Sequence, residues 1–203
     1  MGIRFSLHLY FPVSRLECVL NEIIKLTEPP SEGRMSIWLP NGKKVVVPHT
    51  MKLVPDKSRR RITIGSNLLS FDTVLLLSLD SVIEEYLRRI HLQPLDRTKK
   101  YGVGLLAVSI QTGENYAEVS ISAVSSSQNE IMLKSPVMHG TMSSLIKDCD
   151  GVFALIDTET GNGFYERLLL ADTSKVLSID VVESNYGEDI DYIVTTAQKQ
   201  LAI

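Results

Sequence analysis

The stretch that decides the fold is residues 103–123, VGLLAVSIQTGENYAEVSISA. Apolar and polar side chains alternate on both sides of a polar turn at residues 111–115, and this alternation is the period of β-strands. Two alternating runs joined by a short turn predict a β-hairpin, whose strands pair antiparallel. We therefore expect an antiparallel sheet in this part of the chain.

The same pattern continues on both sides of this hairpin. Asn41-Gly42 is a strong hairpin signal between the runs 35–39 and 43–47. The dense apolar run 71–79 is typical of a strand that is buried on both faces. The strands of the hairpin itself are 103–110 and 116–123. Further strands are expected at residues 3–11, 61–64, 152–156, 165–171 and 176–182. Capping patterns and apolar stripes predict helices at residues 14–27, 81–90, from 136 to near 151, and 190–201. So many adjacent strands exclude a doubly wound parallel fold, and we predict an α+β protein with mostly antiparallel sheets covered by helices.

The length of 203 residues allows one domain or two small ones. Residues 94–100 are polar and contain a proline, which is typical of a linker. This predicts an N-terminal α+β half at 1–93 and a C-terminal α+β half at 101–203, each with a ferredoxin-like arrangement as the candidate. One merged domain is the alternative. If the linker prediction is right, a fragment that ends near Pro94 should unfold cooperatively.

Two features predict the compartment. No apolar run approaches the ~20 residues that span a bilayer, and residues 3–9 are too short and too polar for a signal-peptide core. The chain has only two cysteines, Cys18 and Cys149, separated by 131 positions. We therefore expect a soluble cytoplasmic protein with reduced thiols. Cys149 lies at an expected helix C-terminus, where the helix dipole does not activate a thiol.

Charge is distributed unevenly along the chain. Residues 1–100 hold 16 basic and 10 acidic side chains, whereas residues 101–203 hold 5 basic and 14 acidic ones. The segment 34–61 alone has eight bases and one acid. The weak candidates for binding within it are Lys43, Lys44, Arg59, Arg60 and Arg61.

Three interpretations of the basic segment stay open. Its charges protect exposed strand edges from pairing with other chains, or they attract the acidic half of the same chain or of a second subunit in a homo-oligomer, or they bind nucleic acid. Nucleic acid is the least favoured, because Trp38 is the only aromatic residue in the segment and the whole chain is acidic.

Catalytic signatures are weak. Gly102-Val-Gly104 matches a loose dinucleotide-binding pattern, but a strand follows it where that motif needs a helix. No histidine or cysteine spacing is typical of a metal site, and we expect neither metal nor cofactor. The weak catalytic candidates are His139, near a helix start, and Asp148. The sequence therefore predicts a non-catalytic binding or protein-interaction module. The alternative is an enzyme whose site is assembled where the two halves meet. The third hypothesis is nucleic-acid binding through residues 34–61.

Overall fold

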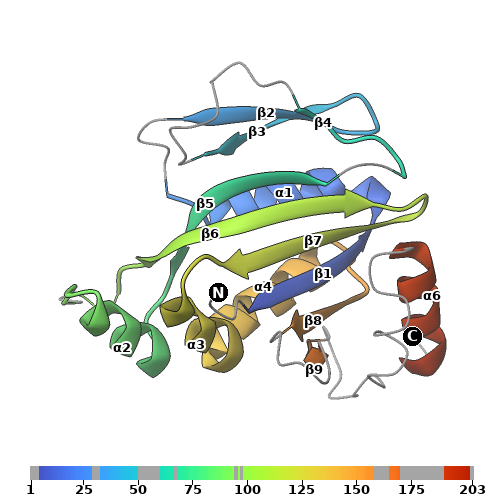
Figure 1. Cartoon of the computed structure of the whole chain (residues 1–203). Helices are drawn as coiled ribbons and strands as arrows, with labels where there is room; N and C mark the ends of the chain where they lie inside the picture. Colours follow the sequence, from blue (N-terminus) through green and yellow to red (C-terminus); the bar gives the residue numbers. More distant parts are fainter. Residues whose placement is uncertain are drawn as a thin grey trace.

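The predicted hairpin of residues 103–123 forms the second and third strands of a six-stranded sheet with the order β5-β6-β7-β1-β8-β9 (Figure 1). Its strands are β1 (Ser6–Pro12), β5 (Leu69–Leu77), β6 (Tyr101–Thr112), β7 (Tyr116–Ala123), β8 (Phe153–Asp157) and β9 (Tyr165–Leu169). Every neighbouring pair in this sheet is antiparallel. The structure is a computed structural model that describes residues 5–28, 33–49, 60–65, 68–93, 96, 98–157, 165–169 and 190–201. The predicted α+β class is confirmed.

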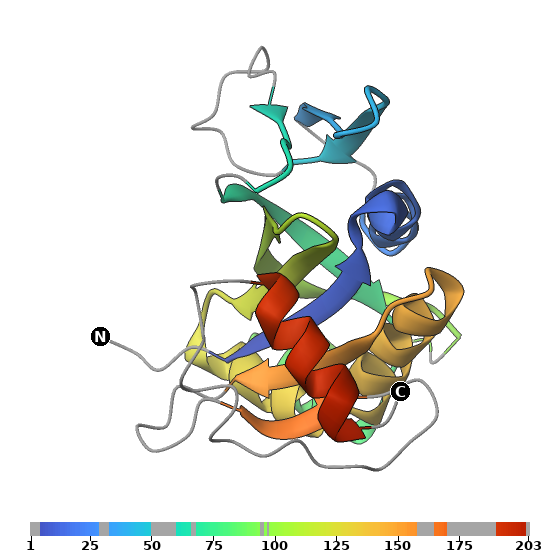
Figure 2. The same ribbon diagram turned by 90° about the vertical axis from the view of Figure 1, so that its right-hand side faces the viewer.

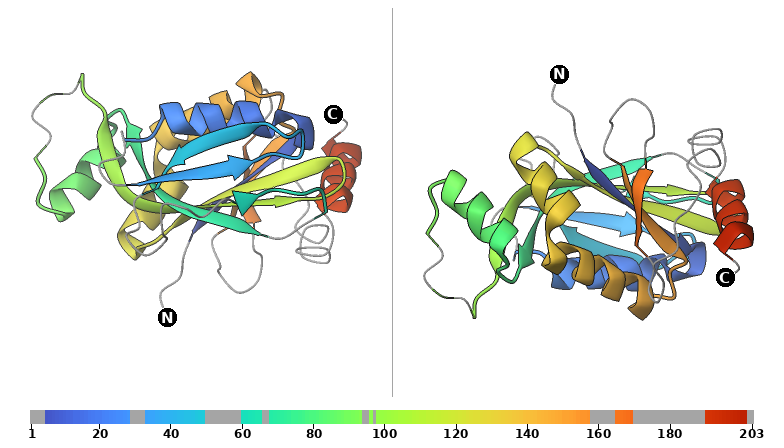
Figure 3. Two further views of the ribbon diagram at one scale, coloured as in Figure 1. Left: turned by 90° about the horizontal axis from the view of Figure 1, so that it is seen from above. Right: turned by 90° about the horizontal axis from the view of Figure 1, so that it is seen from below.

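A second, three-stranded sheet has the order β3-β2-β4. Its strands are β2 (Arg34–Trp38), β3 (Lys44–Pro48) and β4 (Arg60–Arg61). The predicted Asn41-Gly42 turn joins β2 to β3; Gly42 has φ +80°, a conformation that glycine adopts without steric cost. The buried side chains of β2 and β3 belong to the same hydrophobic core as those of the first helix. Seen from above in Figure 3, this small sheet lies alongside that helix.

Five helices are described: α1 (Leu16–Lys25), α2 (Ser81–Arg89), α3 (Ser126–Lys134), α4 (Pro136–Asp148) and α6 (Ile190–Leu201). A short 3₁₀ turn at Val13–Arg15 leads into α1. Helix α3 was not predicted, although Ser125 and Gln128 form a capping box at its start. Asp80 caps α2 and also accepts hydrogen bonds from the Ser135 hydroxyl and the Val137 N–H at the start of α4. One carboxylate therefore holds two helix N-termini together.

The two faces of the large sheet have different cover. Leu7, Leu9 and Phe11 of β1 pack into the main core together with α1 and α4. On the other face Tyr10 stacks on Phe153, with ring centroids 4.6 Å apart, and both rings pack against α6. Figure 2 shows α6 in front of the sheet, with α1 and α4 on its other side. Both faces of β1 are therefore covered, rather than one facing the core and the other the solvent.

Asp191, in the first turn of α6, fixes this helix to the turn between β6 and β7. Its carboxylate accepts hydrogen bonds from the backbone N–H groups of Glu114, Asn115 and Tyr116, at 2.8–3.1 Å. The Asn115 side-chain amide donates to it as well. Hydrogen bonds to a charged group are among the stronger ones, so this turn has a defined position relative to α6.

Two expectations about buried elements need correction. The run 71–79 was expected to be buried on both faces, but β5 is the edge strand of the large sheet and its side chains alternate between buried and partly exposed. The cysteines were expected as reduced thiols, but Cys18 of α1 and Cys149 at the end of α4 form a disulfide, with Cα atoms 5.7 Å apart. Sequence separation gave no sign of this pairing, because the two helices become neighbours only when the sheet brings them together.

The division into halves at 94–100 stays a prediction, as do the ferredoxin-like halves. The strand order bears on it, because β1 and β5 come from residues 1–93 while their hydrogen-bonded neighbours come from residues 101–203. Residues 158–163, where we expect a turn between the strands 152–156 and 165–171, and the predicted strand 176–182 lie outside the described residues. Strand β9 pairs with β8, as expected for the residues on either side of that turn.

Candidate functional site

A backbone strip, residues 61–65, connects the small sheet to the turn between β6 and β7. Three hydrogen bonds fix it: Ile62 N–H to the Trp38 carbonyl oxygen (2.7 Å), the Thr112 hydroxyl to the Thr63 carbonyl oxygen (2.7 Å), and Gly65 N–H to the Gly113 carbonyl oxygen (3.2 Å). Ile62 is buried, whereas Ile64 is 56% exposed. The strip is therefore held in place at both ends while it presents an aliphatic side chain to solvent.

Two adjoining hollows lie along this strip and share Leu39, Pro40 and Ile64. The first measures about 450 Å³ and reaches the start of α1; its other lining residues are Val13, Ser14, Glu17, Asn41, Glu114 and Asn115. The second measures about 370 Å³ and reaches the small sheet; its other lining residues are Trp38, Gly42, Arg61, Ile62 and Thr63. We call the two hollows together the strip groove. An apolar lining with a few polar groups is typical of binding sites.

The two ends of the strip groove carry opposite charge. At one end the exposed carboxylate of Glu114 makes no hydrogen bond or ion pair with a described residue, and the second carboxylate there, Glu17, is paired with Lys43 at 2.8 Å. At the other end the exposed guanidinium of Arg61 makes no such contact with the described part of the chain. Lys44, which lies opposite Trp38 in the β2–β3 register, adds positive charge near that end.

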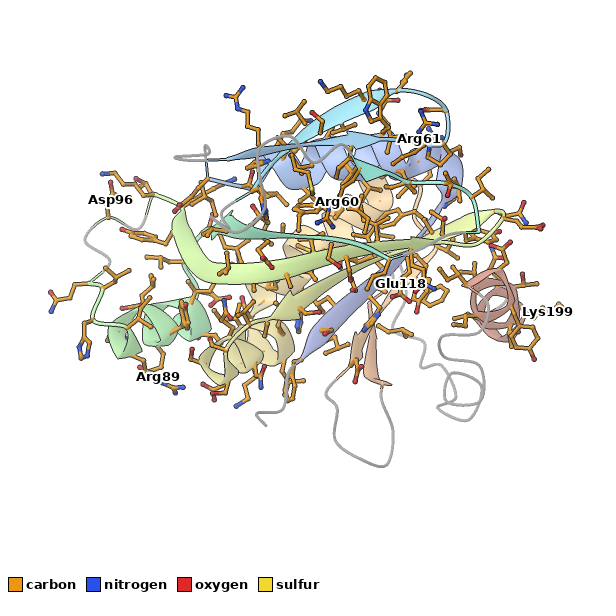
Figure 4. All side chains as sticks on the ribbon, turned by 45° about the horizontal axis from the view of Figure 1, so that its top comes forward. Arg60, Arg61, Arg89, Asp96, Glu118 and Lys199 are labelled. Carbon is orange, nitrogen blue, oxygen red and sulfur yellow. A yellow bond between two sulfur atoms is a disulfide. The ribbon has the colours of Figure 1, made fainter. Side chains whose placement is uncertain are left out.

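The predicted basic residues have three different roles in the structure. Lys43 neutralises Glu17, and Arg60 donates to the Ser70 carbonyl oxygen, which ties the small sheet to β5. Only Lys44 and Arg61 are exposed and unpaired within the described residues. Figure 4 shows Arg60 directed towards the large sheet and Arg61 at the small sheet. Arg59 lies outside the described residues.

The predicted catalytic candidates do not come together. His139 is in the first turns of α4, and its Nε2 donates to the Met132 carbonyl oxygen at 2.7 Å. Asp148 is the exposed last residue of the same helix. Nine residues of helix separate them by roughly 13 Å along the axis. Gly102 and Gly104 lie in β6, as expected for glycines of a strand.

A buried polar cluster that the sequence analysis did not identify lies on the large sheet. His8 of β1 is 4% exposed. Its Nδ1 is 3.0 Å from Glu118 Oε1 of β7, and its Nε2 is 3.9 Å from Asp157 Oδ2 of β8. The Tyr10 hydroxyl donates to the other oxygen of Glu118 at 2.8 Å. Residues from both halves of the sequence thus form one charged cluster.

The cluster changes the acidity of its members. Burial lowers the pKa of His8, but the charges of Glu118 and Asp157 and the hydrogen bond to Glu118 outweigh it, and the pKa is raised above the ordinary 6.5. Burial raises the pKa of Glu118, but His8 and the Tyr10 hydroxyl outweigh it, and the pKa is lowered below the ordinary 4.5. Both shifts favour an imidazolium–carboxylate pair.

This pair predicts a pH-dependent contribution to stability. The raised pKa of His8 stabilises the fold fully below 6.5 and less as the pH rises through its folded-state pKa; the lowered pKa of Glu118 stabilises it above 4.5 and less as the pH falls. We expect Glu118→Gln to lower the free energy of unfolding by about 1–2 kcal/mol between those two values, and by less above the raised folded-state pKa of His8. Urea unfolding at several pH values measures this, with Glu114→Gln as the control, because that carboxylate is exposed and pairs with no described residue. A loss that is the same at every pH would contradict the assignment of the ion pair.

Two further findings concern the described part of the chain only. No group of three or more His, Cys, Asp or Glu side chains in it is arranged to hold a metal ion. None of its helices is long and apolar enough to cross a membrane.

Comparisons with known proteins add little. No protein-family model matches the chain, and no curated protein matches it. Among solved structures, the chain is similar to one in the 1.75 Å crystal structure of the toxic C-terminal tip of CdiA from Pseudomonas aeruginosa in complex with immune protein. The TM-score is 0.40 at 12% identity, over 83% of this chain and 96% of that chain. A likeness at this level carries no argument about fold or function.

Proposed function

We propose that this protein is a non-catalytic protein-interaction module that binds a short segment of a partner protein in the strip groove. The observation that carries the proposal is Ile64, an aliphatic side chain that is 56% exposed on a hydrogen-bonded strip and shared by two hollows. A rigid, partly apolar groove gains binding free energy when a side chain of the partner covers its exposed apolar surface.

Charge complementarity defines the partner. Arg61 and Lys44 have no intramolecular partner among the described residues, so their charges are available to carboxylates of another protein. Arg60 is not available in this way, because its guanidinium is used inside the molecule. A second copy of this chain and a nucleic acid remain outcomes of the experiment, and the first would make the protein a homo-oligomer.

A library of seven-residue peptides tests the proposal. We expect selection on the wild-type protein to enrich peptides whose affinity falls about tenfold in Ile64→Ser, because the anchor contact is lost. Leu68→Ser is the matched control, since Leu68 is 63% exposed but does not line the groove. Trp38 is the only tryptophan and lines one hollow, so its fluorescence reports binding directly.

Three results would overturn the proposal. The first is that no enriched peptide depends on Ile64. The second is that the wild type is a dimer in light scattering and Ile64→Ser makes it a monomer, which would assign the groove to a second copy. The third is that a twenty-residue oligothymidine changes Trp38 fluorescence while no peptide does.

The second candidate function is an enzyme, and the His8 cluster is the observation that favours it. A histidine between two carboxylates could act as a general base, and its members come from both halves of the sequence, as the enzyme alternative expects. We prefer the binding function because His8 is only 4% exposed, whereas the strip groove is open.

The disulfide bears on the compartment. Disulfides persist in oxidising compartments and are rare where glutathione keeps thiols reduced. We infer that the protein works in an oxidising compartment, in place of the cytoplasmic location expected from the sequence.

A further inference from the structure

The two ends of the strip groove differ in charge. This inference rests on the proposed function and specifies the partner. The carboxylate of Glu114, which pairs with no described residue, lies at one end, next to Gly113, to which the strip is hydrogen bonded through Gly65. The guanidinium of Arg61, which makes no contact of this kind within the described part of the chain, lies at the other end, beside Trp38.

The neighbouring charges do not cancel this difference. At the acidic end Glu17 is already paired with Lys43, so it adds no net charge, and the other polar groups there are the hydroxyl of Ser14 and the amides of Asn41 and Asn115. At the basic end Lys44 has the same sign as Arg61. Charges that have no partner among the described residues gain from a ligand of opposite charge without first breaking a contact there.

The spacing of the two ends follows from the strip itself. Arg61 and Gly65 are four residues apart, so the strip spans at most about 13 Å at ~3.3 Å per residue. The apolar surface of Leu39, Pro40 and Ile64 lies between the two ends, since both hollows share it. A five-residue extended segment is as long as this upper limit.

We infer that the groove recognises an extended segment with one basic residue, one acidic residue about four positions away, and an apolar residue between them. The basic side chain pairs with Glu114, the acidic side chain pairs with Arg61, and the apolar side chain covers Ile64. The segment would therefore be selected because it carries one charge of each sign at this spacing.

Three acetylated, amidated peptides test this inference: Lys-Gly-Leu-Gly-Glu, Lys-Gly-Leu-Gly-Lys and Glu-Gly-Leu-Gly-Glu. We expect the wild type to bind the first about fivefold more tightly than the other two at low salt, as exposed ion pairs allow. Arg61→Glu should prefer the peptide with two lysines, and Glu114→Lys the peptide with two glutamates. The double variant Arg61→Glu/Glu114→Lys should return to the first peptide, and 0.5 M salt should reduce every preference.

The outcomes separate this inference from the proposed function. If all three peptides bind equally and Ile64→Ser weakens each, the groove binds a segment but does not read its charges, and the inference is wrong. A wild type that prefers two glutamates would assign recognition to Arg61 and Lys44 alone, which also overturns it. If neither these peptides nor the library bind, the proposed function fails together with the inference.

Discussion

A fragment that ends at Pro94 will show no cooperative unfolding transition. In the large sheet β1 is hydrogen bonded to β7 on one side and to β8 on the other, and β5 is hydrogen bonded to β6. All three partners lie beyond residue 94. Without them β1 loses every sheet partner, and the apolar side chains of both strands lose most of the core that buries them. We infer one merged domain, with a core that neither half completes alone.

The measurement is thermal unfolding by circular dichroism together with the dispersion of amide signals in NMR. The expected result is a non-cooperative melt and collapsed dispersion, as for a chain that lacks fixed packing. Co-expression of residues 1–93 with residues 101–203 is the control and should restore both signals, because the missing strands are then supplied in trans. A cooperative melt of the fragment alone would instead support the division at 94–100.

Local patterns in the sequence predicted the individual strands and helices better than they predicted which of these elements lie next to one another. The alternation in residues 103–123 and the Asn41-Gly42 turn both produced the expected hairpins, because each depends on residues close together in the chain. The position of β1 between β7 and β8 depends on contacts more than 100 residues apart, and one strand's pattern does not say which edge it will join. Helix α3 was missed for a local reason, since its apolar side is small.

The same limit applies to the candidate site, because its residues come together only in the folded sheet. The sequence predicted the two strands that carry His8 and Glu118, but only the pairing of these strands makes a buried cluster. The basic segment was predicted as a set, although the structure uses Lys43 and Arg60 in internal contacts and leaves Arg61 exposed. The strip groove could not be predicted, because it needs the small sheet, α1 and the β6–β7 turn in their final positions.

Removal of the disulfide will lower stability more than any single surface change. Cys18 and Cys149 are separated by 131 positions, so the cross-link closes a long loop and restricts the unfolded chain strongly. For loops of this size the expected loss is about 2–5 kcal/mol. In a chain of 203 residues this corresponds to a decrease of about 10 °C in Tm.

The variant that measures this is Cys18→Ser/Cys149→Ala. Cys149 is 1% exposed, so alanine avoids the burial of an unpaired hydroxyl there, whereas Cys18 is partly exposed and accepts serine. We expect dithiothreitol to lower the Tm of the wild type to that of the variant and to leave the variant unchanged, because only the wild type has a bond to reduce. Peptide binding in the strip groove should persist in the variant below its Tm, since neither cysteine lines the groove. A contrary result would be a non-reduced wild type that reacts with two equivalents of iodoacetamide and whose Tm dithiothreitol leaves unchanged. Cys18 and Cys149 would then not form a disulfide, and the prediction of reduced thiols would be right.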